Sequence, residues 1–544
     1  MKSSQHRSKV QPPPPALVAL GGPRALRLLL FATLALSLAL RCYGLGRQGL
    51  ECEELYTVPA ATGHQYVYLR AEPNEQPPPV PLTAHEYRQL LTPEAGHGLL
   101  SVTGVLARNV HMPLYFFFMH YWVSAFGTSE WALRLPSVIF STLAGLLLFL
   151  LGRALFDAWT GLIAALLFGL MPEQIHFAQQ ARMYPLLVLL AVASTYALAL
   201  ARQRPRAHAP YVVYALTSVA GLYTHYEYVF FLAAQAFYIW CASPLGRERK
   251  RAWLVTQASV ALALCPWLVV SLTQRRASAE VIAWAHGDLS AATLGAEVLS
   301  KLTRLISVPE VPFGWLSALA AYGLLAAGVL ALRAQRGRLM LLCAWLAFPL
   351  AGVLLLDHVL ATRAISIMRY WLLVTPALYL LMAAGVLSCK RAPRRLALVA
   401  PLAGFLCLTA FWTARGELRK KPDRHRELAR FMDQQLAGTT RPTILTEGVN
   451  AIPLALAYYG RGEARVLRYK WVADRTAQQS FSELTGDAQD VWLLVSGDNQ
   501  SASLLEANGF HRSSVQVLFG HILVSRYSRQ VANAPPPGAA GGRL

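Results

Sequence analysis

The sequence predicts a polytopic α-helical membrane protein with a small α/β domain near its C-terminus. Three observations predict this fold class. Of the 544 residues, 55% are hydrophobic and only 15% are charged. Apolar runs long enough to cross a hydrocarbon core of about 30 Å recur along most of the chain. Residues 415–529 then break the pattern, because charged residues return and short apolar runs alternate with helix-like stretches.

The apolar runs predict about eleven spanning helices. They lie at 25–41, 133–151, 159–172, 184–201, 210–224, 228–243, 253–272, 313–332, 339–356, 369–388 and 395–413. Segment 113–126 is apolar and aromatic but short. We expect it to form a helix that lies in the external membrane interface, where aromatic side chains are common, rather than a span.

Loop charges support this set of spans and orient the chain. If 113–126 does not span, every basic cluster falls on the side of the N-terminal tail, as the positive-inside rule requires. These clusters are Arg153, Arg202/Arg204/Arg206, Arg247/Arg249/Lys250/Arg251, Arg333/Arg336/Arg338 and Lys390/Arg391/Arg394/Arg395. We therefore expect a multi-pass protein of the cell inner (plasma) membrane with a cytoplasmic N-terminus and an external, periplasmic C-terminal domain. The net charge of +21 then needs no nucleic acid, and we find no RNA- or DNA-binding motif.

This topology divides the chain into four expected parts. They are a disordered basic cytoplasmic tail at 1–24, a transmembrane domain at 25–414 with an external first loop at 42–132, an external α/β domain at 415–530, and a disordered tail at 531–544. Cys42 and Cys52 share the first external loop, where a disulfide is possible.

The first external loop contains the acidic stretch LECEELYT at Leu50–Thr57, just beyond the first span. Carboxylates at a membrane boundary usually mark a function or a partner, although a solvated loop has the same appearance. Glu53 or Glu54 could accept a proton from a hydroxyl nucleophile. The stretch is therefore a candidate for general-base chemistry.

Three arginines fall on the same outer face although positive charge is otherwise concentrated inside: Arg134, Arg182 and Arg369. Each alone is also explained as a side chain that snorkels to lipid phosphates. Arginine stays charged and binds phosphate through two parallel hydrogen bonds. Carboxylates and guanidinium groups at one membrane face suit group transfer from a lipid-linked phosphate to an external acceptor.

Several motifs, taken in order, are similar to those of a known enzyme family. They are Glu53-Glu54 followed by Tyr56-Thr57, HMPLYFFFMHYWVSAFGTSEWALRLPS (His111–Ser137), QQARMYP (Gln179–Pro185), THYEYVFFLAAQ (Thr224–Gln235), MRYWLLVTPAL (Met368–Leu378), and KPDRHRELARFM with the later Ala457–Tyr459 patch. The chain resembles glycosyltransferase family 39 over about residues 25–510. This family includes bacterial protein O-mannosyltransferase-like and aminoarabinose-transferase-like membrane enzymes of the class C fold. Glu53 departs from the family, which usually has Asp there.

The resemblance implies a membrane glycosyltransferase, a hexosyltransferase that uses a lipid-phosphate-linked sugar. A sugar would move from a polyprenyl-phosphate donor to an acceptor hydroxyl on the external face, with inversion at the anomeric carbon. The acceptor would be a lipid, a glycan or a protein, and membrane lipids would surround the enzyme. The sequence names neither sugar nor acceptor. No cofactor is certain, and a divalent metal is possible.

Roles follow for individual residues. The catalytic candidates are Glu53, as the base, and Glu54. The expected donor-phosphate ligands are Arg182, Tyr184, Arg369 and Tyr370. Further substrate or metal contacts are expected from His111, His225 and Arg134.

Two other functions remain open. A flippase or transporter could use the same charges to pass a polyprenyl phosphate, although hydropathy shows no internal repeat and no charge in mid-span. An inactive homologue that only binds lipid is the other alternative, because Glu53 and neighbouring positions depart from the family pattern.

Overall fold

The structure is a computed structural model, and the residues that it describes fall in a series of ranges. These are 22–64, 82–93, 97–107, 110–204, 207–242, 247–272, 286–287, 290–308, 314–388, 424–439, 442–447, 451–461, 464–468, 488–495, 500–519 and 522–529. The predicted span 395–413, most of the N-terminal tail and the C-terminal tail 531–544 lie outside them.

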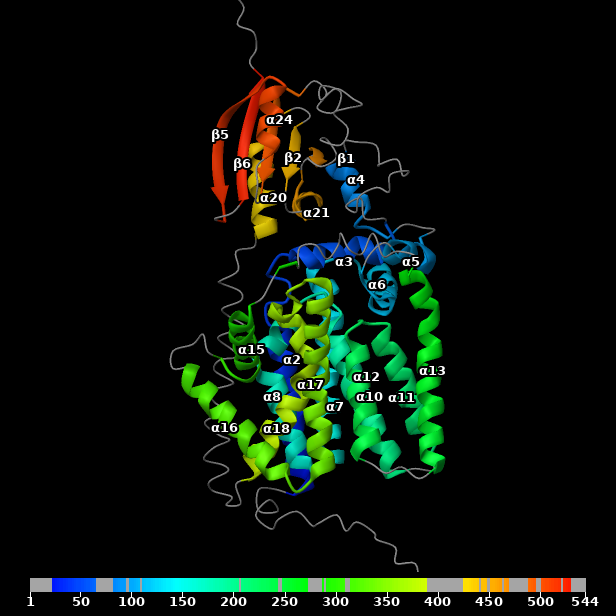
Figure 1. The fold of residues 1–544 in the computed structure, drawn as a ribbon. Helices are drawn as coiled ribbons and strands as arrows, with labels where there is room; N and C mark the ends of the chain where they lie inside the picture. Colours follow the sequence, from blue (N-terminus) through cyan, green and yellow to red (C-terminus); the bar gives the residue numbers. More distant parts are fainter. Residues whose placement is uncertain are drawn as a thin grey trace, which may run out of the picture. The chain divides into compact units, whose positions relative to one another are not determined.

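The chain divides into two compact units (Figure 1). The helical unit comprises residues 1–45, 106–118 and 131–418, and the sheet unit comprises residues 46–105, 119–130 and 419–544. The helix α6 (Pro113–Phe126) matches the predicted short helix in its bounds and contributes residues to both units. Its expected position in the membrane interface stays a prediction.

The helical unit is built from long apolar helices at the predicted positions. They are α2 (Pro23–Cys42), α7 (Glu130–Leu155), α8 (Ala158–Leu170), α9 (Pro172–Ala178), α10 (Tyr184–Gln203), α11 (Ala209–Leu222), α12 (Tyr228–Ala242), α13 (Arg247–Leu272), α16 (Gly314–Leu332), α17 (Arg336–Leu360) and α18 (Thr375–Ser388). Within the described residues, seven segments are long and apolar enough to cross a membrane, and α8 with α9 adds an eighth that bends by 63°. The prediction of a polytopic helical membrane protein is confirmed.

Shorter helices complete this unit on the way to and from the long ones. They are α15 (Ala291–Ile306) and the 3-10 helices η2 (Ala364–Ser366) and η3 (Met368–Val374). The helix η3 runs directly into α18, so together they form one apolar segment, Met368–Ser388.

Glycines allow two of the long helices to pack backbone against backbone. A Cβ atom on Gly328 of α16 would lie 2.0 Å from the carbonyl oxygen of Leu381 on α18. A Cβ atom on Gly385 would lie equally close, at 2.0 Å, to the carbonyl oxygen of Leu324. Membrane helices associate through such small residues because lipid provides no hydrophobic drive. Any larger side chain at either glycine would separate α16 from α18.

A fully buried arginine ties the end of α2 to the end of α8. Arg41 donates hydrogen bonds to the carbonyl oxygens of Phe168 (3.1 Å) and Gly169 (2.8 Å) and to the hydroxyl of Ser141 (2.9 Å). These carbonyls end α8, where the helix dipole favours a cation. The guanidinium therefore fixes the point from which the chain bends into α9 and approaches α10.

The sheet unit contains a six-stranded sheet in the order β1-β3-β2-β4-β6-β5. Its strands are β1 (Leu82–Thr83), β2 (Thr443–Glu447), β3 (Arg465–Arg468), β4 (Asp490–Val495), β5 (Phe510–Leu518) and β6 (Ile522–Arg529). Strand β2 pairs in parallel with β3 and β4, and the other pairs are antiparallel. The predicted C-terminal α/β region is confirmed, and the structure adds β1 from the first loop.

The same unit also contains helices, some of which pack against the sheet. In the sheet unit they are α3 (Cys52–Thr62), α4 (Ala84–Gln89), α5 (Leu99–Ala107), α20 (Arg424–Gln435), α21 (Ile452–Tyr459) and α24 (Ser501–Ala507). The core joins Leu445, Leu493 and Val495 of the central strands to Leu505 of α24 and Phe510 of β5. The nearly continuous burial of β2 and β4 gives the C-terminal region a hydrophobic core of its own.

Candidate active site

Four of the predicted site residues meet around one imidazole at one end of the helical unit. Arg182 lies in the turn before α10, Tyr184 begins α10, and Arg369 and Tyr370 lie in η3. The ring of His225, between α11 and α12, is 5.8 Å from the ring of Tyr184 and 5.9 Å from that of Tyr370, centroid to centroid. Segments far apart in the sequence thus converge here.

Both arginines rest on the faces of the tyrosines. The Cζ atom of Arg182 is 5.9 Å from the ring centroid of Tyr184, and that of Arg369 is 5.5 Å from the centroid of Tyr370. At these distances the ring quadrupole attracts a cation. Arg182 is only 4% exposed. The rings therefore hold two guanidinium groups in place without consuming their charge.

The turn that carries Arg182 is set by its neighbours on both sides. Pro185 occupies the first turn of α10, where a missing N–H costs nothing and the fixed φ suits a helix start. The hydroxyl of Ser137 on α7 donates a hydrogen bond of 3.1 Å to the carbonyl oxygen of Arg182. The sequence motif around Arg182 thus ends one connection and starts the next helix at a defined point.

A single carboxylate organises the loop before η3. Asp357, in the last turn of α17, accepts hydrogen bonds from the hydroxyl of Thr362 (2.6 Å) and the backbone N–H groups of Ala364 (2.6 Å) and Ile365 (2.8 Å). The indole N–H of Trp371 also donates a hydrogen bond of 2.8 Å to the carbonyl oxygen of Ile365. Buried N–H groups need such acceptors. This network fixes the start of η3 and hence its arginine and tyrosine.

The histidines of the cluster are neutral at neutral pH. Burial lowers the pKa of His225 to about 3, with further lowering by the charges of Arg182 and Arg369. Burial also holds the pKa of His111 well below its usual range, and the same two guanidinium groups and His225 add to the effect. A buried imidazole near fixed cations resists protonation. The cluster therefore combines two permanent cations with neutral N–H donors.

Glu227 is a buried carboxyl beside His225 that the candidate set from the sequence did not include. It is 3% exposed, and burial raises its pKa well above the usual value. Its backbone N–H donates a hydrogen bond of 3.2 Å to Nδ1 of His225. Because Nδ1 accepts this bond, the proton of the neutral imidazole resides on Nε2. The signal for Glu227 was visible in THYEY, where a carboxylate interrupts two apolar runs.

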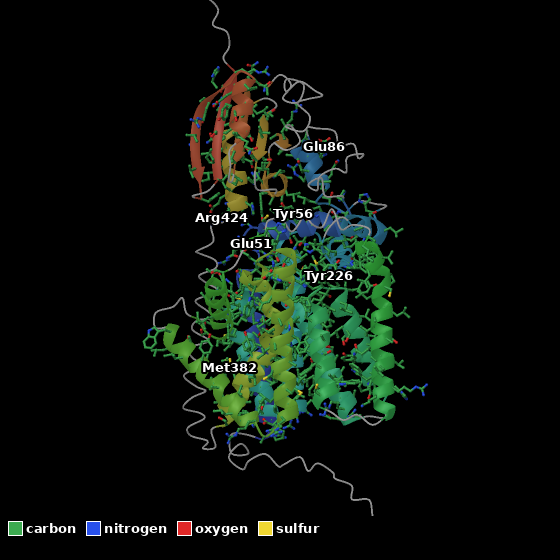
Figure 2. All side chains as sticks on the ribbon, viewed as in Figure 1. Glu51, Tyr56, Glu86, Tyr226, Met382 and Arg424 are labelled. Atoms are coloured by element: carbon green, nitrogen blue, oxygen red, sulfur yellow. The ribbon has the colours of Figure 1, made fainter. Side chains whose placement is uncertain are left out.

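The acidic candidates Glu53 and Glu54 lie in the first turn of α3, in the sheet unit. Glu54 is buried, and its Oε2 accepts the backbone N–H of Glu51 at 2.9 Å in a capping box. Glu53 is half-buried and has no part in that box. Figure 2 labels Glu51 and Tyr56 on this helix. Of the two neighbours, Glu54 has the clear structural task.

Residues of the C-terminal region hold the start of α3 in place. The backbone N–H of Leu50 donates a hydrogen bond of 2.6 Å to the hydroxyl of Tyr459. Nδ1 of His425 lies 2.8 Å from the carbonyl oxygen of Leu50. Arg426 forms an ion pair with Glu130, and its Cζ is 5.3 Å from the ring centroid of Tyr459. His425 and Tyr459, each from a motif that the sequence singled out, therefore support the start of the acidic helix.

Arg134, the two loop cysteines and the possible metal are the remaining predictions for the site. Arg134 is buried, and its Nη1 donates a hydrogen bond of 2.8 Å to the carbonyl oxygen of Leu45. This bond holds the chain just beyond α2. Cys42 and Cys52 are free thiols, so the structure does not contain the disulfide that their shared loop made possible. Among the described residues, no group of three or more His, Cys, Asp or Glu side chains could hold a metal ion.

The fold is similar to that of class C membrane glycosyltransferases. The structure of ArnT from Cupriavidus metallidurans in the apo state matches with a TM-score of 0.58 at 13% identity, covering 92% of this chain and 98% of that chain. The same protein bound to undecaprenyl phosphate matches with a TM-score of 0.54 at 16% identity, covering 93% of this chain and 98% of that chain. Identities this low show the fold alone.

The sequence itself is similar to a known family over part of its length. Residues 110–270 match the family described as dolichyl-phosphate-mannose-protein mannosyltransferase, and this segment contains the His111, Arg182 and His225 motifs. The match confirms the predicted resemblance over this segment. No curated protein matches the sequence.

Proposed function

We propose that the protein moves a sugar from a polyprenyl-phosphate donor to an acceptor hydroxyl at the external membrane face. The observation that carries this proposal is the cluster of Arg182, Arg369 and neutral His225 at one end of the helical unit. Two guanidinium forks and an N–H donor form a site for a phosphate group. The class C fold and the family match support the same reading.

In this mechanism Glu53 is the base. Its carboxylate takes the proton of the acceptor hydroxyl while the oxygen attacks the anomeric carbon. The bond from that carbon to the phosphate oxygen breaks, and polyprenyl phosphate leaves with the electron pair. Arg182 and Arg369 neutralise the charge that develops on this leaving group. Attack from the face opposite the phosphate inverts the anomeric carbon. The half-buried Glu53 suits this role better than the capping residue Glu54.

The distribution of charge supports an external location for the phosphate cluster. Arg153, Arg202, Arg336 and Arg338 all lie at the opposite ends of their helices, away from Arg182. The positive-inside rule favours the cytoplasm for that basic end. The cluster would then face the periplasm together with the C-terminal α/β domain. A cytoplasmic N-terminus follows from the same assignment.

The test is turnover of a purified polyprenyl-phosphate hexose by the purified protein, after mass spectrometry of cell-envelope glycoconjugates with and without the protein has identified the acceptor. We expect Glu53→Gln to lower the rate by about 10²–10⁴-fold, because the amide cannot take the proton. Glu54→Gln is the matched control, since glutamine also completes a capping box.

Two results would contradict the assignment of the base. A Glu53→Gln variant that keeps more than about a tenth of the rate would exclude Glu53 as the base. An equal loss in Glu54→Gln, with the fold intact by circular dichroism, would move the role to Glu54. Movement of the intact donor across vesicles without any sugar transfer would instead support a transporter.

A further inference from the structure

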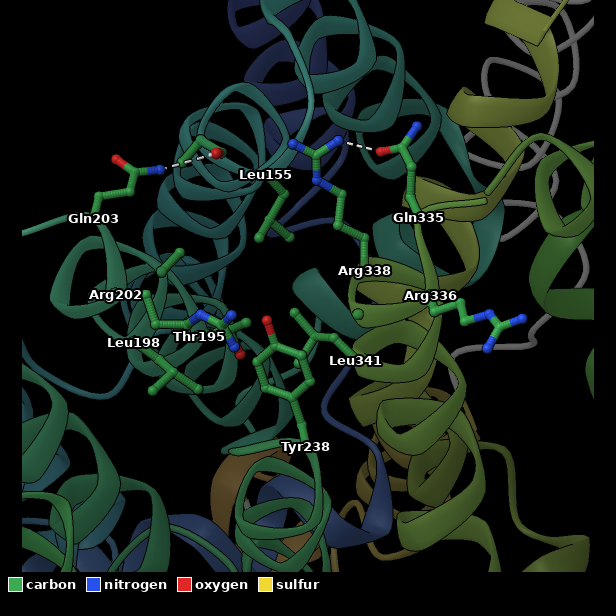
Figure 3. Close-up of a pocket in the computed structure, with 13 residues that line it drawn as sticks. Leu155, Thr195, Leu198, Arg202, Gln203, Tyr238, Gln335, Arg336, Arg338 and Leu341 are labelled. Carbon is green, nitrogen blue, oxygen red and sulfur yellow. Dashed lines mark hydrogen bonds between the residues drawn. The ribbon is translucent and has the colours of Figure 1, made fainter. Parts of the chain in front are cut away.

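A cavity of about 390 Å³ lies at the end of the helical unit remote from the phosphate cluster. Its walls come from the ends of α7, α10 and α12 and from the start of α17 (Figure 3). Helix α10 has 20 residues, so this end is about 30 Å from the turn that carries Arg182. The cavity therefore has no part in the proposed sugar transfer.

The lining mixes apolar and cationic side chains. Leu155, Leu198 and Leu341 provide apolar wall, and Arg202 and Arg338 provide charge. None of the residues that line the cavity is acidic. A cavity with this lining combines a surface for hydrocarbon with sites for an anion.

Within the described part of the chain, Arg202 contacts an aromatic ring and forms no ion pair with a carboxylate. Its Cζ is 4.9 Å from the ring centroid of Tyr238, and Figure 3 shows the two side chains facing each other. Its Nη1 is buried and has no hydrogen-bond acceptor among the described residues. A buried N–H of a cation without an acceptor is costly. An anion bound in the cavity would remove that cost.

Arg338 approaches the cavity from α17 and is held in the same way. Its Cζ is 5.5 Å from the ring centroid of Phe156, and its Nη1 donates a hydrogen bond to the side-chain amide of Gln335. Neither contact neutralises the guanidinium, because an aromatic ring and an amide carry no net charge. The two arginines thus keep their charge while their positions are defined.

We propose that this cavity binds the phosphate headgroup of an anionic membrane lipid. Arginine forks match phosphate oxygens. The leucine wall suits the first carbons of the lipid, and basic cavities between membrane helices bind anionic headgroups. Such a lipid would join the ends of α7, α10, α12 and α17. The proposal does not depend on the proposed sugar transfer.

The test measures thermal unfolding of the purified full-length protein in detergent while one ligand is titrated. The ligands are short-chain phosphatidylglycerol, phosphatidylcholine with the same chains, and inorganic phosphate. We expect saturable stabilisation by phosphatidylglycerol, with an apparent affinity about tenfold weaker in an Arg202→Gln/Arg338→Gln variant, as for lost charged hydrogen bonds. An Arg204→Gln/Arg333→Gln variant is the matched control, because these exposed arginines carry equal charge outside the lining.

A variant that keeps every charge makes the test independent of the arginines. Leu198→Phe narrows the cavity, so we expect it to weaken phosphatidylglycerol binding as well, and it decides the matter if the double variant does not fold. Equal losses in both double variants, or full binding in Leu198→Phe, would overturn the proposal in favour of surface electrostatics. Stabilisation by inorganic phosphate at the same concentration as the lipid would overturn the assignment to a lipid.

Discussion

The two ends of the helical unit use the same local device for different chemistry. At one end Arg182 and Arg369 lie on tyrosine rings, and at the other Arg202 and Arg338 lie on Tyr238 and Phe156. In each case an aromatic face holds a guanidinium group without neutralising it. Both ends therefore combine arginines with aromatic rings.

The difference lies in the groups that accompany the arginines. The first end adds His225 and Glu227, a buried imidazole and a buried carboxyl whose pKa values are shifted. The remote cavity adds the amides Gln203 and Gln335 and contains neither histidine nor carboxyl among its lining residues. Shifted titratable groups are typical of functional sites, whereas amides only bind. This difference supports the proposals of chemistry at the first end and lipid binding at the second.

The largest expected difference between the two ends is the effect of removing one arginine on donor binding and turnover. We expect Arg182→Ala to lower donor affinity and turnover together, with a loss in rate of about 10²-fold, as for other groups that stabilise a developing charge. Arg333→Ala, at the basic end and outside the cavity lining, should leave both unchanged. Donor titrations and initial rates measure the effect. Unchanged affinity and rate in Arg182→Ala would assign Arg182 to snorkelling.

A conservative substitution sharpens the same comparison. Arg182→Lys keeps the charge but loses the planar fork that matches two phosphate oxygens. We expect a loss of about tenfold in donor affinity, between wild type and Arg182→Ala. Salt should interfere only modestly, because a buried site is screened less than an exposed one. If the lysine variant equals wild type, charge alone holds the phosphate and fork geometry is irrelevant.

The loop around Asp357 should affect donor binding only by fixing the position of Arg369. Asp357→Ala leaves two backbone N–H groups without their acceptor, which should lower the free energy of unfolding by roughly 1–3 kcal/mol and raise the donor KM. Asp357→Asn keeps a carbonyl oxygen and should recover much of the donor affinity. Equal KM values in wild type and both variants would show that this loop does not position Arg369.

The pH dependence of stability should reveal the buried His225. Its pKa is about 3 in the folded protein and 6.5 in an exposed histidine. Below pH 6.5 the unfolded chain takes up a proton that folded His225 refuses, so the free energy of unfolding falls until about pH 3. Above pH 6.5 His225 contributes nothing to this dependence.

The variant His225→Gln should therefore lose less stability than wild type as the pH falls from 6.5 towards 4, in thermal melts at matched ionic strength. Tyr238→Phe, a change at the remote cavity, should follow the wild-type curve in shape. Parallel curves for wild type and His225→Gln would mean that His225 titrates normally and is not held beside the arginines.

Much of the fold was predictable because membrane spans leave a strong hydropathy signal. The predicted segments from 25–41 to 369–388 correspond to helices, with a bend of 63° where Pro172 begins α9. The motifs with Arg182, His225 and Arg369 also predicted which segments converge. Short-range patterns of apolar residues, prolines and charged ends suffice for this level of detail.

Contacts between distant segments were not predictable from the same patterns. Strand β1 has two residues and forms by pairing with β3. A segment this short has no local alternation of apolar and polar residues from which a strand could be predicted. Arg41 lies at the end of the first apolar run, yet it is fully buried against the end of α8. The cavity around Arg202 needs four helix ends to meet. Each feature arises from tertiary packing, which the order of residues specifies only through the whole fold.

Photocrosslinking of the donor phosphate tests most directly which end performs the chemistry. A polyprenyl phosphate with a photoreactive group on its phosphate would be crosslinked to the purified protein in nanodiscs, and the modified peptides identified by mass spectrometry. We predict crosslinks in the peptides that contain Arg182, His225 or Arg369, and competition by unlabelled polyprenyl phosphate but not by phosphatidylglycerol. Crosslinks confined to the peptides that contain Arg202 or Arg338 would contradict the assignment of the two ends.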